Sequence, residues 1–486
     1  MLQALVARGS PLILVNAYDV GVPFVRMLVL GRFLDLRELG FASLLAAAYA
    51  TLEQISDFAI YRFVLSAPRE HYDEALASAH ALSVLRGLAL GGIGFAAAPI
   101  LASAFSLGPQ WPSFAAIGLI AFVRSLEHLG PRVAERDYRY GAQAKVATVA
   151  TCLSLAALFA SVALKLGHNA IVLSLLGQML GIVVATRVFS RTPYRLRFRS
   201  PFIRRAFRFS YPLMFNGFGL AISAQGDRFL VGAMLDLPSL GVYTVLTLVT
   251  VVPIVVVSRI INTVLVAALF NAAEEVRRID ARLRLASRAT PIIGASLAVG
   301  VLMLMNIVVP VVFGHKFIAS QWMVILLALG VFVRVARVDP GTALLLVEGR
   351  TKRLALVNLA VISGIFFSGA LMFFFRNFES AALGRVLGEL AGLTIMHRLA
   401  HAVRRGAAAD NLVALGICAA IVSFASGITF FMPSGGGLVS KLTLLCLFLA
   451  GMAMWASRFA LPLAKVAFPA QFPSNHGALG SADEIA

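Results

Sequence analysis

Charged side chains recur inside long apolar runs of this sequence, where each of them carries a large solvation cost. Runs of about 20 apolar residues have the length that crosses a bilayer, and a charge at the centre of one costs about 2.5–3.5 kcal/mol on insertion scales. Such residues are therefore candidates for function. Asp19 and Arg26 are seven positions apart, and Glu53 and Asp57 are four apart, so each pair shares one helix face. The candidate substrate- or ion-binding residues are Asp19, Arg26, Glu53, Asp57, Asp227, Arg228, Arg259, Arg334 and Arg337.

Arginine in this setting suits the recognition of phosphate. Its planar guanidinium binds phosphate oxygens through two parallel hydrogen bonds and keeps its charge when it is buried. Arg26, Arg334 and Arg337 are therefore the candidates to line a cavity for an anionic group. The neighbouring acids would hold these arginines or bind a coupling cation, and coupling to Na+ or H+ stays open. We expect no other cofactor and no metal site. No phosphate loop occurs, and beside the spacing of four between His397 and His401 an arginine, Arg398, replaces the glutamate of a zinc-protease motif.

Two other interpretations of these charges stay open. Asp19 with Arg26, or Asp227 with a neighbour, can form buried ion pairs that only support the fold. Arginines near the ends of runs can extend to lipid headgroups instead, and these are Arg62, Arg124 and Arg259. Pro340 follows Arg337 by three residues, and we expect it to kink or break that helix.

The composition places the chain in a membrane. Of 486 residues, 59% are hydrophobic and only 13% are charged, and the mean hydropathy is +0.87. A soluble chain usually has about 45–50% apolar and about 25% charged residues. The net charge of +19 would suggest nucleic acid in a soluble protein. Here the basic residues lie between apolar runs, as the positive-inside rule requires, so no nucleic-acid partner is expected.

We expect an all-α polytopic membrane protein with about 14 transmembrane helices, and 12 is the alternative count. The loops after even-numbered runs are much richer in Lys and Arg, which predicts that they and both termini are cytoplasmic. The runs are approximately 10–31, 39–65, 80–105, 113–130, 144–165, 169–189, 210–233, 239–268, 288–313, 321–346, 353–375, 380–400, 411–432 and 438–461.

An internal repeat divides the chain. The segment LDLRELG (34–40) returns as LDLPSLG (235–241), 201 positions later, and six of eleven residues from Gly31 and Gly232 onward are identical. Each copy lies between the first and second runs of its half, and six runs separate them. This arrangement predicts two parallel six-helix bundles with a substrate cavity between them. The expected domains are bundles 1–190 and 210–405, a basic cytoplasmic linker 191–209, two additional helices in 406–465 and a disordered cytoplasmic tail 466–486.

Within the linker, Ile203, Ala206 and Phe207 recur at helical spacing among arginines. This pattern is typical of an amphipathic helix that touches anionic membrane lipids. A solvated basic loop would satisfy the positive-inside rule equally well, so both interpretations stay open.

Three further stretches resemble a known family. They are RFLDLRELGF (32–41), then FSYPLMFNG (209–217) with QGDRFLVG (225–232) and LGVY (240–243), and EGRTK (348–352). They resemble the Wzx-type polysaccharide flippases of the MATE-like multidrug/oligosaccharidyl-lipid/polysaccharide exporter (MOP) superfamily. The resemblance implies a carrier in the bacterial plasma (inner) membrane that moves an undecaprenyl-diphosphate-linked oligosaccharide from the inner to the outer leaflet. It also implies membrane lipids, a polysaccharide polymerase and the export machinery as partners.

The function expected from the sequence is therefore a transporter that works by alternating access, and not an enzyme. A cation-coupled drug or small-molecule antiporter and a flippase for a cell-wall lipid precursor are alternatives. A membrane polymerase or ligase that uses the same lipid donor fits less well. The longest external loops, 106–112 and 314–320, are short and contain no acidic residue.

Overall fold

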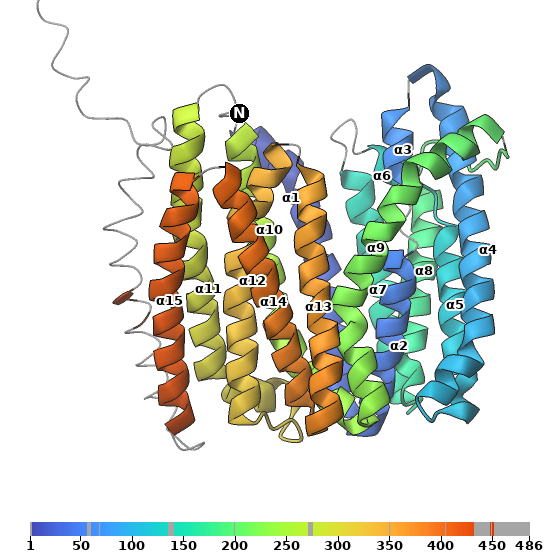
Figure 1. The fold of residues 1–486 in the computed structure, drawn as a ribbon. Helices are drawn as coiled ribbons and strands as arrows, with labels where there is room; N and C mark the ends of the chain where they lie inside the picture. The colour runs from blue at the N-terminus through green and yellow to red at the C-terminus, as the bar shows by residue number, and fades with distance from the viewer. Residues whose placement is uncertain are drawn as a thin grey trace, which may run out of the picture. The chain divides into compact units, whose positions relative to one another are not determined.

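The computed structural model describes residues 2–55, 60–67, 69–134, 140–198, 200–270, 276–348, 350–403, 405–431, 448, 450 and 451. These residues form helices joined by short turns, with no strand among them (Figure 1). The predicted all-α class is confirmed.

Thirteen long helices, of 15 to 38 residues, account for most of the part that the structure describes. They are α1 (Leu2–Phe33), α2 (Leu36–Ile55), α4 (Tyr72–Ala104), α5 (Trp111–Ser125), α7 (Gly141–Ala163), α8 (Asn169–Phe189), α9 (Ser200–Met234), α10 (Leu237–Phe270), α11 (Val276–Phe313), α12 (Gln321–Val347), α13 (Thr351–Phe375), α14 (Phe378–Val403) and α15 (Arg405–Phe431). Shorter helices are α3 (Ile60–Ser66), α6 (Gly130–Val133) and the 3-10 turns η1 (Arg69–His71) and η2 (Gly108–Gln110).

Twelve of the first thirteen predicted apolar runs each overlap one long helix. The second run, 39–65, was expected to be one span but covers the end of α2 at Ile55 and a separate helix, α3, that begins at Ile60. The fourteenth run, 438–461, lies almost entirely outside the described residues. Nine helices in the described ranges are long and apolar enough to cross a membrane. Helix α12 continues through Pro340 to Val347, so the break expected there is not found.

Two compact units divide the chain by their internal contacts. Unit 1 comprises Met1–Leu248, Val309–Ile318 and Ile365–Gly384, and unit 2 comprises Val249–Val308, Ala319–Gly364 and Arg385–Ala486. In unit 1, α4 packs along α5, α7 along α8, and α2 along α9. The predicted bundle boundaries at 190 and 405 stay a prediction.

The two repeat copies both lie in unit 1 and begin their helices in the same way. Asp35 caps α2, because its Oδ1 accepts a hydrogen bond from the Glu38 amide at 2.7 Å. Asp236 caps α10, because its Oδ1 accepts one from the Ser239 amide, also at 2.7 Å. An aspartate at this position contributes about 0.5–2 kcal/mol, which explains why the repeated sequence contains Leu-Asp-Leu at the turn.

The repeat copies also contact each other reciprocally. A Cβ on Gly40 would collide with the Leu237 carbonyl oxygen, and a Cβ on Gly241 would lie 2.6 Å from the Leu36 carbonyl oxygen. Leu36 and Gly40 of the first copy correspond to Leu237 and Gly241 of the second. The glycine of each copy therefore contacts the equivalent leucine of the other copy. Contacts of this kind are those of a two-fold arrangement. Two rings extend it, because Phe313 packs on Gly31 and Phe105 packs on Gly232.

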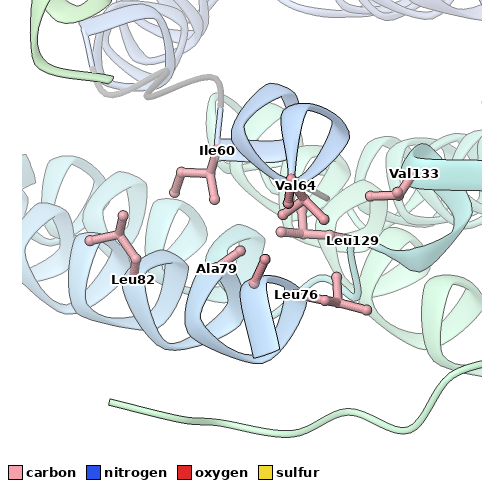
Figure 2. Packing of buried hydrophobic residues seen from close by; sticks show 9 residues of the cluster. Ile60, Val64, Leu76, Ala79, Leu82, Leu129 and Val133 are labelled. Atoms are coloured by element: carbon pink, nitrogen blue, oxygen red, sulfur yellow. The ribbon is translucent and has the colours of Figure 1, made fainter. Parts of the chain in front are cut away.

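An apolar cluster joins α3, α4 and α6 in unit 1. Figure 2 shows Ile60 and Val64 of α3 against Leu76, Ala79 and Leu82 of α4, with Leu129 and Val133 beside them. The first turns of α9 pack on this cluster through Phe202 and Ile203, whereas Arg204, Arg205 and Arg208 are exposed. The linker is therefore helical from Ser200 onward, but among its predicted apolar residues Ile203 packs on the cluster whereas Phe207 is exposed. Its contact with anionic lipid stays a prediction.

We predict that Gly40→Ala and Gly241→Ala each lower the free energy of unfolding by about 1–3 kcal/mol, since an added methyl meets backbone that cannot rotate away. The measurement is the apparent Tm of the detergent-purified protein. Gly92→Ala in α4 is the matched control because a Cβ there meets nothing within 4 Å. Unchanged stability in the Gly40 and Gly241 variants would contradict the close contact between the repeats.

Candidate functional site

A cavity of about 460 Å³ lies within unit 1, surrounded by α1, α2, α5, α7, α8, α9 and α10. Its charged lining consists of Arg26, Arg124, Arg132 and Arg228 together with Asp19, Glu53 and Glu127. Polar lining comes from the amides Gln143, Gln178 and Gln225 and from Tyr18, Ser43, Tyr49, Thr151, Thr186 and Thr244. Arginines exceed acids by one, so the lining favours an anionic ligand.

Arg26 of α1 is a buried cation in the cavity lining, with only 5% of its surface exposed. Its Nε and Nη2 donate to the Ser154 hydroxyl of α7 at 3.1 and 2.9 Å, and Nη2 also donates to the Gln178 amide oxygen of α8. Ser154 is held in turn by Ser174, whose hydroxyl lies 3.0 Å away. Both direct partners are neutral, and no carboxylate pairs with Arg26 among the described residues.

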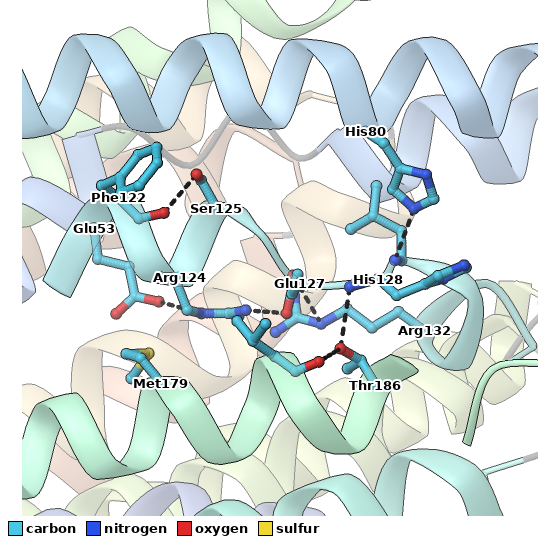
Figure 3. Close-up of polar contacts among 12 residues, drawn as sticks. Glu53, His80, Phe122, Arg124, Ser125, Glu127, His128, Arg132, Met179 and Thr186 are labelled. Atoms are coloured by element: carbon cyan, nitrogen blue, oxygen red, sulfur yellow. Dashed lines mark hydrogen bonds and ion pairs between the residues drawn. The ribbon is translucent and has the colours of Figure 1, made fainter. Parts of the chain in front are cut away.

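A chain of alternating charges forms another part of the lining (Figure 3). Arg124, at the end of α5, is 9% exposed and pairs with Glu127. Its Nε lies 3.5 Å from Glu53 Oε1 on α2, and Arg132 Nε on α6 lies 3.8 Å from Glu127 Oε1. The order of the chain is Glu53, Arg124, Glu127, Arg132. Each glutamate here has an arginine within 4 Å, whereas no carboxylate lies within ion-pair distance of Arg26 in the part of the chain that the structure describes.

Four of the residues that the sequence singled out line this cavity together, namely Asp19, Arg26, Glu53 and Arg228. Arg228 Nη1 donates to the Gln225 amide oxygen at 2.9 Å. Asp227 is 3% exposed and does not line the cavity; its Oδ2 accepts a hydrogen bond from the Tyr243 hydroxyl at 2.7 Å. The buried pair suggested for Asp19 and Arg26 is not found, because Arg26 uses Ser154 and Gln178 instead.

The remaining candidates lie in unit 2 or outside the described residues. Arg337 Nε is 2.7 Å from Glu389 Oε2 of α14, and this ion pair is buried. Arg334 is half-buried on the same helix, and Arg259 is exposed on α10. Asp57 falls in 56–59, outside the described residues. The roles assigned to these residues stay predictions.

Sequence reasoning missed the central members of the charge chain. One interpretation left open by the sequence was that Arg124 extends to the headgroups; this is wrong, because Arg124 is buried and paired with Glu127. The sequence contained one signal for this pair. Arg124 and Glu127 are three positions apart at the end of α5, a spacing at which two side chains can meet. The neutral partners of Arg26, Ser154 and Gln178, carry no signal of their own, because serine and glutamine are common in such helices.

Comparisons with known proteins agree on one class. A family model described as "Polysaccharide biosynthesis protein" matches residues 29–321, more than half of the 486 residues. Among solved structures, the lipid II flippase MurJ in an inward closed conformation has a TM-score of 0.62 at 12% identity, covering 96% of this chain and 99% of that one. An inward-facing multidrug resistance MATE family transporter of the MOP superfamily has a TM-score of 0.56 at 14% identity, with coverages of 84% and 95%. A comparison with curated protein sequences finds no match.

The fold is thus that of multi-spanning membrane transporters, as both solved structures are described as a flippase or a transporter. The chain belongs to the family of polysaccharide biosynthesis proteins. The solved structures share the fold that the resemblance to the MATE-like exporter superfamily implies.

We predict that Glu127→Gln destabilises the protein by about 3–5 kcal/mol, because it leaves Arg124 buried beside a neutral group. Thermal unfolding of the purified protein measures this. Glu74→Gln is the matched control, since Glu74 pairs with the exposed Arg197 at 3.5 Å and surface pairs contribute about 0–1 kcal/mol. Equal stability of the two variants would show that the charge chain does not support unit 1.

Proposed function

We propose that this protein flips an undecaprenyl-diphosphate-linked oligosaccharide, the repeat unit of an exopolysaccharide, O-antigen or capsule, from the cytoplasmic to the outer leaflet. Alternating access of the cavity to the two sides would carry the head group across. The family match supports a role in polysaccharide biosynthesis, and the flippase and transporter neighbours support transport.

One observation carries the proposal: the charge of Arg26 is buried in the cavity with neutral partners only. An uncompensated charge in an apolar interior costs several kcal/mol, so it persists only where something offsets that cost. A diphosphate would supply the missing negative charge and accept paired hydrogen bonds from the guanidinium. Arg228 on α9 lines the same cavity and would contribute a second positive charge.

The polar lining suits sugars next to that diphosphate. The Gln143 Oε1 and Thr244 Oγ1 atoms are buried, and neither has a hydrogen-bond partner within the described part of the protein. Both are acceptors that sugar hydroxyls could satisfy. The volume of about 460 Å³ is typical of a small-molecule site, so the cavity suits the diphosphate with its first sugars.

We propose that both termini are cytoplasmic, because of the charge pattern of the loops. The resemblance to the polysaccharide flippases supports a location in the bacterial inner membrane, and Na+ or H+ would be the coupling ion. A polysaccharide polymerase and the export machinery would take up the flipped unit. A cell-wall lipid precursor is the second candidate substrate, because one structural neighbour is described as a lipid II flippase.

We predict that Arg26→Gln reduces surface polysaccharide at least tenfold at normal protein abundance. Loss of a charge-assisted hydrogen bond weakens binding by about 1.5–3 kcal/mol, which is roughly 10–100-fold. Arg26→Lys should retain part of the activity, because it keeps the charge but loses the paired geometry. Surface polysaccharide and protein abundance are measured in cells that contain only the variant.

A stability measurement separates a binding role from a structural one. If Arg26 serves the substrate, Arg26→Gln leaves the apparent Tm unchanged or raises it, because it removes an uncompensated charge. The exposed Arg37→Gln on α2 is the matched control and should export normally. Normal export by Arg26→Gln would contradict the proposal. Loss of cell-wall synthesis with normal surface polysaccharide would favour the second candidate substrate.

A further inference from the structure

A second cavity of about 360 Å³ adjoins the first within unit 1, and we call it the vestibule. Its own lining includes Gln54 at the end of α2, Tyr61 of α3, and Ser83 and Arg86 of α4. It therefore lies where α2 and α5 end. The loop charges predict that this end of unit 1 faces the cytoplasm, the side on which a lipid-linked substrate is assembled.

The charge chain is what the two cavities share. The residues that line both are Ala50, Glu53, Arg124, Glu127 and Arg132. Four of these five are the members of the chain in Figure 3, in the order Glu53, Arg124, Glu127, Arg132. The ion pairs thus form the partition between the vestibule and the cavity that contains Arg26.

The vestibule favours an anion. Arg86, Arg124 and Arg132 line it against Glu53 and Glu127 only. Each of these glutamates lies within 4 Å of an arginine, so a free cation would have to compete with guanidinium groups for them. A phosphate-bearing anion, in contrast, can replace a glutamate as the partner of an arginine, because its oxygens accept two parallel hydrogen bonds from the guanidinium.

We propose that the vestibule is an anion-binding subsite that receives the diphosphate of a lipid-linked substrate before it reaches Arg26, and that the charge chain is the gate between the two positions. The proposal rests on the proposed function. The diphosphate binds Arg86 and Arg132 first and then replaces the glutamates as the partner of Arg124. A group with two phosphates can engage two arginines at once, whereas a single carboxylate cannot, so the gate discriminates against small monoanions.

The test uses a thiol placed in the vestibule. Gln54→Cys is introduced into the full-length chain after its three cysteines, Cys152, Cys418 and Cys446, are replaced by alanine. The purified protein is placed in lipid nanodiscs, and the rate of thiol labelling is measured with increasing farnesyl diphosphate, with farnesol as the uncharged comparison. We expect farnesyl diphosphate to slow labelling at least fivefold and farnesol to leave it unchanged.

Two further variants assign the protection to the vestibule. With Arg86→Gln, the concentration that gives half protection should rise at least tenfold, while Arg86→Lys keeps most of the effect. With Arg26→Gln, protection should persist, because the central cavity is not needed for the first binding step. The labelling rate without ligand should be the same in all variants, which shows that each one is folded around the thiol.

The outcomes are separable from those of the proposed function. Absence of protection, protection unaffected by Arg86→Gln, or protection abolished by Arg26→Gln would each overturn the vestibule proposal. None of them depends on whether Arg26→Gln cells export polysaccharide, so the two proposals can fail independently.

Discussion

A guanidinium inside an apolar helix bundle must be solvated by the protein itself, and the arrangement of unit 1 around Arg26 follows from this constraint. Arg26 lies on helix α1. Helices α7 and α8 supply the Ser154 hydroxyl and the Gln178 amide oxygen, which accept hydrogen bonds from its guanidinium. The three described arginines at this level of burial differ in one respect: Arg124 and Arg337 each have a buried glutamate partner, and Arg26 has none. The first two can be explained by the fold alone. Arg26 has only neutral hydrogen-bond partners, which is why we propose that a substrate supplies a negative charge to it.

A second constraint is the close contact between the repeat copies. Glycine at positions 40 and 241 lets the starts of α2 and α10 approach each other at backbone distance, and the equal offsets make the contact reciprocal. Helices α9 and α10, which flank the second copy, also reach the cavity of unit 1, and Arg228 and Thr244 line the same space as Arg26.

Much of the fold could be predicted from the sequence. In an apolar run of membrane-spanning length, the backbone polar groups must be hydrogen-bonded within the segment, and a helix achieves this. The gathering of Asp19, Arg26, Glu53 and Arg228 was also foreseeable, since charges inside such runs turn away from lipid. Their partners were not. Which carboxylate meets which arginine depends on how α2, α5 and α6 pack, so the sequence alone could not place Glu127 beside Arg124. For the same reason it could not show that Glu389, 52 positions along the chain, neutralises Arg337.

The measurement that tests the central claim most directly is the leaflet distribution of lipid-linked oligosaccharide in cells depleted of this protein. A membrane-impermeant glycosidase or lectin reports only the units exposed on the outer side of the inner membrane. If the protein flips the lipid-linked oligosaccharide, we expect complete units to accumulate on the cytoplasmic side, protected from the reagent, and surface polysaccharide to be lost. Units that accumulate on the outer side, or an unchanged pool with normal surface polysaccharide, would contradict it.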